Sequence, residues 1–224
     1  MNIGVATLSQ QVVISRFFAG VYKWMTLAMA VTALVAWQTA SSEVFITYLM
    51  AHQGLFFFLI IAQLGMVIAL SAWVQKMSFT VAALTFIGYA ALTGLTLSTI
   101  FLVYTAASIA KAFVVTSAMF GVMSVYGYTT KRDLSAFGSF LFMSLIGIII
   151  GSLLNFWLKS PLVEWMVTYG GIVVFAGLAA WDHQKLKAFA LMGSDNLIIH
   201  GALALYLDFI NLFLMILRVM NDRR

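Results

Sequence analysis

Long apolar runs separated by short polar breaks dominate this chain. A membrane-spanning helix needs about 20 mostly apolar residues. Seven runs meet that length, at approximately residues 21–40, 55–74, 79–104, 112–130, 136–158, 163–186 and 198–219. Runs such as residues 141–154 do not alternate apolar and polar positions, as the strands of a membrane barrel would. The pattern predicts an all-α, polytopic membrane protein: an N-terminal segment (1–20), seven transmembrane helices (21–219) and a short tail (220–224).

The composition supports this class. Hydrophobic residues make up 63% of the 224 and charged residues only 8%, whereas a soluble domain carries about 25% charged residues. Too few charges remain for a surface that faces water, so the surface is expected to face lipid. The chain has no cysteine, which excludes disulfides and thiolate metal sites.

The distribution of the basic residues predicts how the chain is oriented. The twelve Lys and Arg residues are scattered rather than gathered in a patch with aromatics, so nucleic acid is not an expected partner. Cytoplasmic loops of membrane proteins carry an excess of Lys and Arg. With the N-terminus inside, the inner segments carry Arg16, Lys23, Lys76, Lys131, Arg132, Lys185 and Lys187, and the outer loops carry Lys111 and Lys159. We therefore predict a multi-pass membrane protein with a cytoplasmic N-terminus; the basic tail leaves the side of the C-terminus open.

Asp208 is the clearest ionisable group at membrane depth. It lies ten residues into the last apolar run, which is ~15 Å of helical rise and close to the midplane. A lone carboxylate there costs at least ~2.5 kcal/mol. Gly201, Ala204 and Asn211 share its helical stripe, so we expect Asp208 to face protein, with Asn211 as a possible support.

Asp182, near the inner end of the sixth run, is a candidate partner for Asp208. The two runs are antiparallel, and the depths of the two carboxyls differ by ~7 Å of helical rise, which helix tilt or a disrupted helix end could absorb. Two carboxyls in contact share a proton and titrate as a coupled pair. The alternatives stay open: Asp182 as a solvated helix-end residue paired with Lys185 or Lys187, and Asp208 as a structural carboxyl.

The sequence contains no recognisable metal-binding or catalytic motif. His183 and His200 could join the two aspartates as ligands, but their spacing matches no metal motif, and helix-interface roles are expected instead. The sequence contains no HExxH, nucleotide loop or Ser-His-Asp order. We expect neither enzymatic activity nor a resident cofactor.

Three stretches carry a resemblance to a known family: TGLTLSTIF (93–101), SVYGYTTKRDLS (124–135) and GALALYLDFINLF (201–213). Together with the seven runs they resemble bacterial members of the Bax inhibitor-1 family. The resemblance implies six helices around a central seventh. It also implies a pH-dependent calcium leak gated by two aspartates, here Asp182 and Asp208, which would be the ligands if calcium binds.

The resemblance also frames the alternatives. The family's Tyr-Asp-Thr-Gln on the sixth helix reads Trp-Asp-His-Gln here, which makes His183 a possible supporting residue. Where some members place a glutamate and an arginine on the second helix, this chain offers Gln63, a possible supporting residue, and then Val-Gln-Lys at 74–76. A non-conducting regulator that binds another membrane protein, such as a protease, is the second hypothesis. An intramembrane aspartyl protease is disfavoured, because no glycine immediately precedes Asp208.

Overall fold

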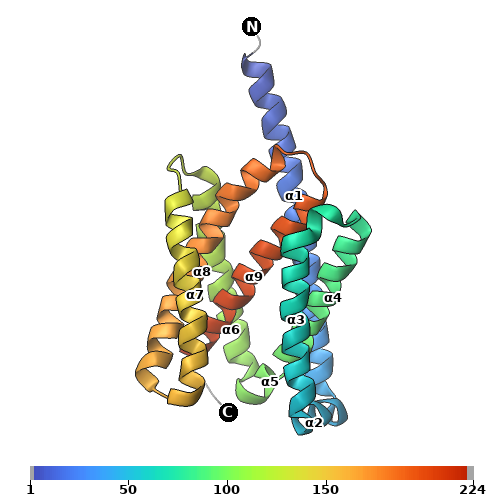
Figure 1. The fold of residues 1–224 in the computed structure, drawn as a ribbon, viewed down its shortest axis with the longest axis vertical. Helices are drawn as coiled ribbons and strands as arrows, with labels where there is room; N and C mark the ends of the chain where they lie inside the picture. The colour runs from blue at the N-terminus through green and yellow to red at the C-terminus, as the bar shows by residue number, and fades with distance from the viewer. Residues whose placement is uncertain (1–2, 221–224) are drawn as a thin grey trace. The chain divides into compact units, whose positions relative to one another are not determined.

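The computed structural model describes residues 3–220, without the side chains of residues 3–8, 50 and 53. Residues 221–224 of the predicted tail therefore lie outside the description. The elements of the described chain (Figure 1) are α1 (Ile3–Ser41), α2 (Glu43–Ala51), α3 (Gln53–Trp73), a 3-10 turn η1 (Val74–Lys76), α4 (Phe79–Leu97), α5 (Ile100–Val103), α6 (Ala106–Thr129), α7 (Ser135–Leu158), α8 (Pro161–Ala190) and α9 (Asn196–Val219). All of them are helical, which confirms the all-α prediction.

Seven stretches within residues 3–220 are long and apolar enough to cross a membrane, as predicted. The first candidate span, Ser9–Ser41, is longer than the expected 21–40, because α1 is helical from Ile3 onward. Large apolar side chains point outward over much of the described surface; Trp157 on α7, for example, is 73% exposed. Such a surface suits lipid and not water, and the chain is a multi-pass membrane protein.

The third predicted run, 79–104, is a helix followed by a short second helix. Ser78 caps the start of α4: its side chain accepts a hydrogen bond from the Val81 amide (3.3 Å), an ordinary N-cap. It ends at Leu97, where the Ser98 hydroxyl donates to the Leu95 carbonyl (2.6 Å) and the Thr99 hydroxyl to the Thr96 carbonyl (2.9 Å). Hydroxyls that bond nearby carbonyls compete with the helical ladder, which accounts for the break before α5.

The described chain forms two compact units. The first unit holds residues 3–105 and 188–206, and the second holds 106–187 and 207–220. In the first unit, α1 and α3 both pack on α4. α1 and α4 approach closely at Gly94, because a Cβ at that position would lie 2.7 Å from the Thr32 carbonyl oxygen. In the second unit, Gly127 of α6 lies directly against the Ala180 backbone of α8 and leaves no room for a side chain.

α9 is the most buried span: 61% of the residues in its apolar stretch are buried, followed by 50% for α8, against a third or less in each of the others. The sequence predicts that the stripe with Gly201, Ala204, Asp208 and Asn211 faces the protein, and it says nothing of the other faces of α9. Leu203 and Leu217 are as buried as Asp208. Protein therefore covers α9 on several faces. The ring of six helices around a seventh stays a prediction.

Candidate functional site

The second unit brings Asp182 of α8 and Asp208 of α9 together. Their side chains interact as hydrogen-bond and charge partners. Asp208 is 5% exposed, and Asp182 is half-buried. The axial mismatch estimated from the sequence does not keep them apart. This carboxyl pair is the candidate functional site.

The surroundings of the carboxyl pair leave it short of hydrogen-bond donors. Oδ2 of Asp208 is fully buried and has no hydrogen-bond partner among the described residues. The positive charge that acts on Asp182 belongs to Lys185, whose ammonium group also lies 4.9 Å from the Trp181 ring. Two carboxyls in contact, one of them with an oxygen that receives no hydrogen bond from the described residues, cannot both hold a full charge cheaply, and a shared proton would balance them.

His183 is a packing residue between helices. It is fully buried, and its Nδ1 donates to the Ala179 carbonyl one turn earlier (2.5 Å). The ring meets Phe120 of α6 edge to face at 5.6 Å, and Phe120 meets Phe209 of α9 at 5.5 Å. This aromatic chain joins α8, α6 and α9 beside the carboxyl pair. The expected interface role of His183 therefore matches its contacts.

The other histidine considered for a metal site belongs to the first unit, where His200 packs on Phe189 with ring centroids 5.6 Å apart. Within residues 3–220 no group of three or more His, Asp or Glu side chains is arranged to hold a metal ion. The carboxyl pair is thus a two-residue feature, with no further His, Asp or Glu side chain among the described residues placed to complete a metal site.

Gln184, next to His183, forms two hydrogen bonds that link the C-terminal part of α8 to the α6–α7 loop. Its side-chain amide donates to the Arg132 carbonyl (2.7 Å), and its carbonyl accepts from the Leu134 amide (2.8 Å). One turn further, the Lys187 ammonium donates to the Tyr128 carbonyl. Sequence reasoning noted Gln184 only as part of a motif. Its position two residues after Asp182 was the available signal, but the loop that it binds lies some 50 residues away.

The loop itself carries an exposed carboxyl, Asp133. Hydrogen bonds from the Ser135 side chain and backbone amide lower the pKa of Asp133 below its usual value, and the amide bond measures 2.9 Å. Asp133 is therefore an ionised group at neutral pH beside Lys131 and Arg132. It contrasts with the buried Asp182–Asp208 pair, in which Oδ2 of Asp208 receives no hydrogen bond from the described residues.

Two residues that the sequence suggested as supports make their described contacts elsewhere. The half-buried Asn211 donates to the Leu207 carbonyl of its own helix (2.8 Å). Gln63 belongs to the first unit, where its amide donates to Thr96 (3.4 Å) and its carbonyl accepts from Thr93 (3.4 Å). Neither contact involves an aspartate, so the geometry gives no support for their assistance to the pair.

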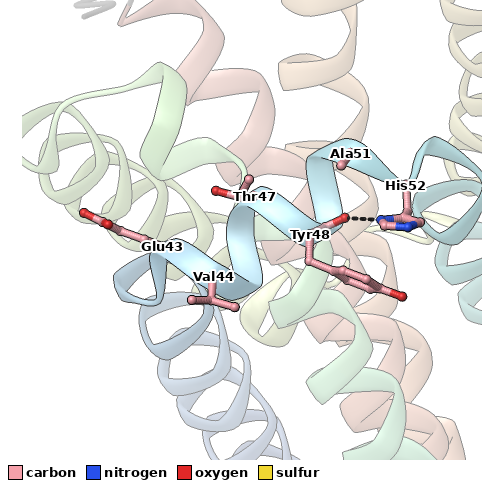
Figure 2. Close-up of a pocket in the computed structure, with 6 residues that line it drawn as sticks. All are labelled: Glu43, Val44, Thr47, Tyr48, Ala51 and His52. Atoms are coloured by element: carbon pink, nitrogen blue, oxygen red, sulfur yellow. Dashed lines mark hydrogen bonds between the residues drawn. The ribbon is translucent and has the colours of Figure 1, made fainter.

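A shallow surface depression in the first unit is a weaker candidate. It is lined by Glu43, Val44, Thr47, Tyr48, Ala51 and His52 (Figure 2). His52 already contacts Tyr48: its Nδ1 donates a hydrogen bond to the Tyr48 carbonyl (2.9 Å), and the centroids of the two rings lie 4.1 Å apart. Because α2 and its C-cap supply all the lining, the depression is an open surface of one short helix and does not enclose a ligand.

Comparison with known proteins gives matches over nearly the whole chain. Residues 14–224 match the model of a family described as inhibitor of apoptosis-promoting Bax1. The inner membrane protein YbhL of Escherichia coli (strain K12) is 56% identical over 215 residues, covering 93% of this chain and 92% of that protein. Uncharacterized protein RP147 of Rickettsia prowazekii is 44% identical (93% and 90% covered), and uncharacterized protein YrjE of Lactococcus lactis is 41% identical (92% and 90% covered).

Proposed function

This chain belongs to the Bax inhibitor-1 family, and on that premise we propose that it is a pH-sensitive cation leak that conducts calcium. The observation that supports this proposal is the direct interaction of Asp182 with Asp208 inside two membrane spans. A carboxyl pair at this depth is costly to keep. Such a cost is expected where the pair serves ion or proton movement.

The proposed gate works through the shared proton. With one proton between them, the two carboxyls attract each other and hold α8 against α9. Removal of that proton leaves two negative charges, which repel by about 4 kcal/mol at 4 Å in a protein-like dielectric. That energy shifts a two-state equilibrium by about a thousandfold, and so flux should rise as the pH rises.

The neighbours of the pair set the electrostatic conditions of this gate. On α8, Lys185 offsets part of one negative charge, and His183 is bonded to its own helix. The two α6 residues that contact α8 or α9 in this region are uncharged: Phe120 packs on Phe209 of α9, and Gly127 lies against the Ala180 backbone of α8. The next polar residue on α9, Asn211, is uncharged as well. The two carboxyls are thus the groups expected to dominate the pH response.

Calcium flux from proteoliposomes, measured between pH 5 and 9, tests the proposal. Wild-type flux should rise with pH, whereas Asp182→Asn and Asp208→Asn should each give a flat profile, because a single carboxyl next to an amide has no like charge to repel. A wild-type profile as flat as those of the variants would exclude the gate.

A non-conducting regulator of another membrane protein is the second candidate. The neutral Gln63, bonded to Thr93 and Thr96, favours it, because the second span lacks an acidic group that would help to attract a cation. Co-purification with a membrane protease that survives Asp182→Asn and Asp208→Asn together would favour this function over the leak.

We also propose an inner-membrane location with a cytoplasmic N-terminus, and no enzymatic activity or resident cofactor. The E. coli relative is named as an inner membrane protein, which supports the location, and the excess of Lys and Arg on one side supports the orientation. Reporter fusions that are active only in the cytoplasm test it: a fusion at the α6–α7 loop should be active and one at the α7–α8 loop inactive.

A further inference from the structure

A second polar cluster lies within the first unit, built entirely from uncharged groups. The Thr32 hydroxyl of α1 lies 2.7 Å from the Tyr206 hydroxyl of α9. Thr32 also donates to the Ala90 carbonyl of α4 (2.9 Å). On α4, the Thr93 side chain interacts with the hydroxyls of both Tyr206 and Tyr89. The cluster therefore ties α9 to α1 and α4 at membrane depth.

The direction of the central hydrogen bond follows from counting hydrogens. A hydroxyl has one hydrogen and two lone pairs. Thr32 gives its hydrogen to the Ala90 carbonyl, which can only accept. The Tyr206 hydroxyl must therefore be the donor to Thr32. The result is a directed chain from Tyr206 through Thr32 to the backbone of α4.

Packing reinforces this polar contact. Tyr206 is fully buried (0% exposed), and Thr32 is 4% exposed. The Tyr206 ring meets Phe86 and Tyr89 of α4 edge to face, with centroids 5.7 and 5.9 Å apart. α1 approaches α4 closely at Gly94, which places Thr32 within reach of the α4 backbone. A buried hydroxyl needs a partner at such a site, because water cannot replace the bond.

Tyr206 and Asp208 stand two residues apart on one uninterrupted helix. Two residues correspond to ~3 Å of rise and ~200° of rotation, so the two side chains leave α9 on nearly opposite sides. Any slide or turn of α9 at Tyr206 must carry Asp208 with it. A specific bond at Tyr206 therefore fixes the height and rotation of this part of α9, and of the Asp208 that it carries, relative to α1 and α4.

We infer that Tyr206 is a positioning residue: the bond from its hydroxyl to Thr32 holds α9 in the setting in which Asp208 meets Asp182. The inference rests on the proposed function only for its effect on ion flux, because the setting of α9 can be measured separately. It requires neither a charge nor a bound ligand at the cluster.

A single-cysteine experiment tests the setting of α9 directly. The chain has no native cysteine, so Leu212→Cys, at a fully buried position one turn beyond Asp208, gives one unambiguous thiol. Its alkylation rate by N-ethylmaleimide is measured in proteoliposomes. Adding Tyr206→Phe, which keeps the ring and removes the hydroxyl, should raise the rate about threefold, the population change that corresponds to one hydrogen bond between membrane helices.

Matched variants separate the hydrogen bond from general damage. Tyr126→Phe removes a hydroxyl from an exposed tyrosine and should leave the rate unchanged. Thr32→Val should raise the rate, and Thr32→Ser, which keeps the hydroxyl, should restore it. If Tyr206→Phe does not fold, the two Thr32 variants decide the question. Equal rates in Tyr206→Phe and Tyr126→Phe, or in Thr32→Ser and Thr32→Val, would overturn the inference.

Calcium flux in the same vesicles distinguishes this inference from the proposed function. Tyr206→Phe should raise flux about threefold at the pH where the wild type is closed, and the rise with pH should persist because both aspartates remain. Altered alkylation with no wild-type flux at any pH would retain the positioning role and reject the leak. A wild-type flux that rises with pH, together with an alkylation rate that Tyr206→Phe does not change, would retain the leak and reject the positioning role.

Discussion

The two halves of α9 use polar groups in opposite ways. Tyr206, in the first unit, donates to Thr32 and sits among uncharged hydroxyls and aromatic rings. Asp208, in the second unit, faces another carboxyl and keeps one buried oxygen without a hydrogen-bond partner among the described residues. The first cluster has the same charge at any physiological pH. In the proposed gate the second cluster changes its charge with pH, and this difference would separate a fixed contact from a responsive one.

The strongest way to break this comparison is to remove one carboxyl. Asp208→Asn should stabilise the protein relative to the wild type at high pH, where the wild-type pair is doubly charged. The expected difference is up to about 4 kcal/mol, the repulsion of two charges at 4 Å, and it should shrink as the pH falls. Thermal unfolding in detergent between pH 5 and 9 measures it. A difference that does not vary with pH would mean that the pair does not titrate in this range.

Thr32→Val should have the next largest effect, and at every pH. It removes two buried hydrogen bonds, the one between Tyr206 and Thr32 and the one from Thr32 to the Ala90 carbonyl, each worth about 1 kcal/mol of unfolding free energy. Tyr206→Phe should cost less, about 0.6 kcal/mol, because Thr32 still donates to Ala90. The same unfolding series measures both. Thr85→Val, which removes an exposed hydroxyl bonded within α4, is the control, and a loss as large as that of Thr32→Val would contradict the assignment.

Gln184→Ala tests how far the second unit depends on its loop. The change removes two hydrogen bonds to the α6–α7 loop, each worth about 1 kcal/mol. Cleavage by trypsin after Lys131 or Arg132 should become faster in membranes that expose this loop. Gln38→Ala, at an exposed glutamine of α1, should cleave at the wild-type rate. Equal rates for the two variants would show that Gln184 does not restrain the loop.

The smallest effect is expected at Asp133, the exposed carboxyl of that loop. The pKa of Asp133 is lowered by Ser135, so the ionised form of Asp133 stabilises the folded loop at every pH above the pKa of an unfolded aspartate. That contribution is lost as the pH falls through the lowered folded value. Ser135→Ala should raise the Asp133 pKa toward normal, which NMR titration of a carboxyl-labelled sample can follow. An unchanged pKa in Ser135→Ala would show that the Ser135 side-chain hydrogen bond does not lower it.

Much of the architecture follows from local properties of the chain. Seven apolar runs and few charges predict a helical membrane protein, because apolar length and composition are enough to choose lipid over water. The cost of a charge at depth marks Asp208 as a residue that needs a partner. The break of the third run at Ser98 and Thr99 was missed, because each hydroxyl could equally have bonded within a continuing helix.

Contacts between helices had to come from the tertiary structure. Periodicity allowed Asp182 to reach Asp208 but did not require it, since the meeting depends on how far α8 and α9 slide and turn against each other. The same holds for Thr32 and Tyr206, which are 174 residues apart, and for Gln184 and its loop. In lipid, close packing and hydrogen bonds between helices select that setting. The sequence alone thus determined that Asp208 needs a partner, and only the packed helices decided which residue it is.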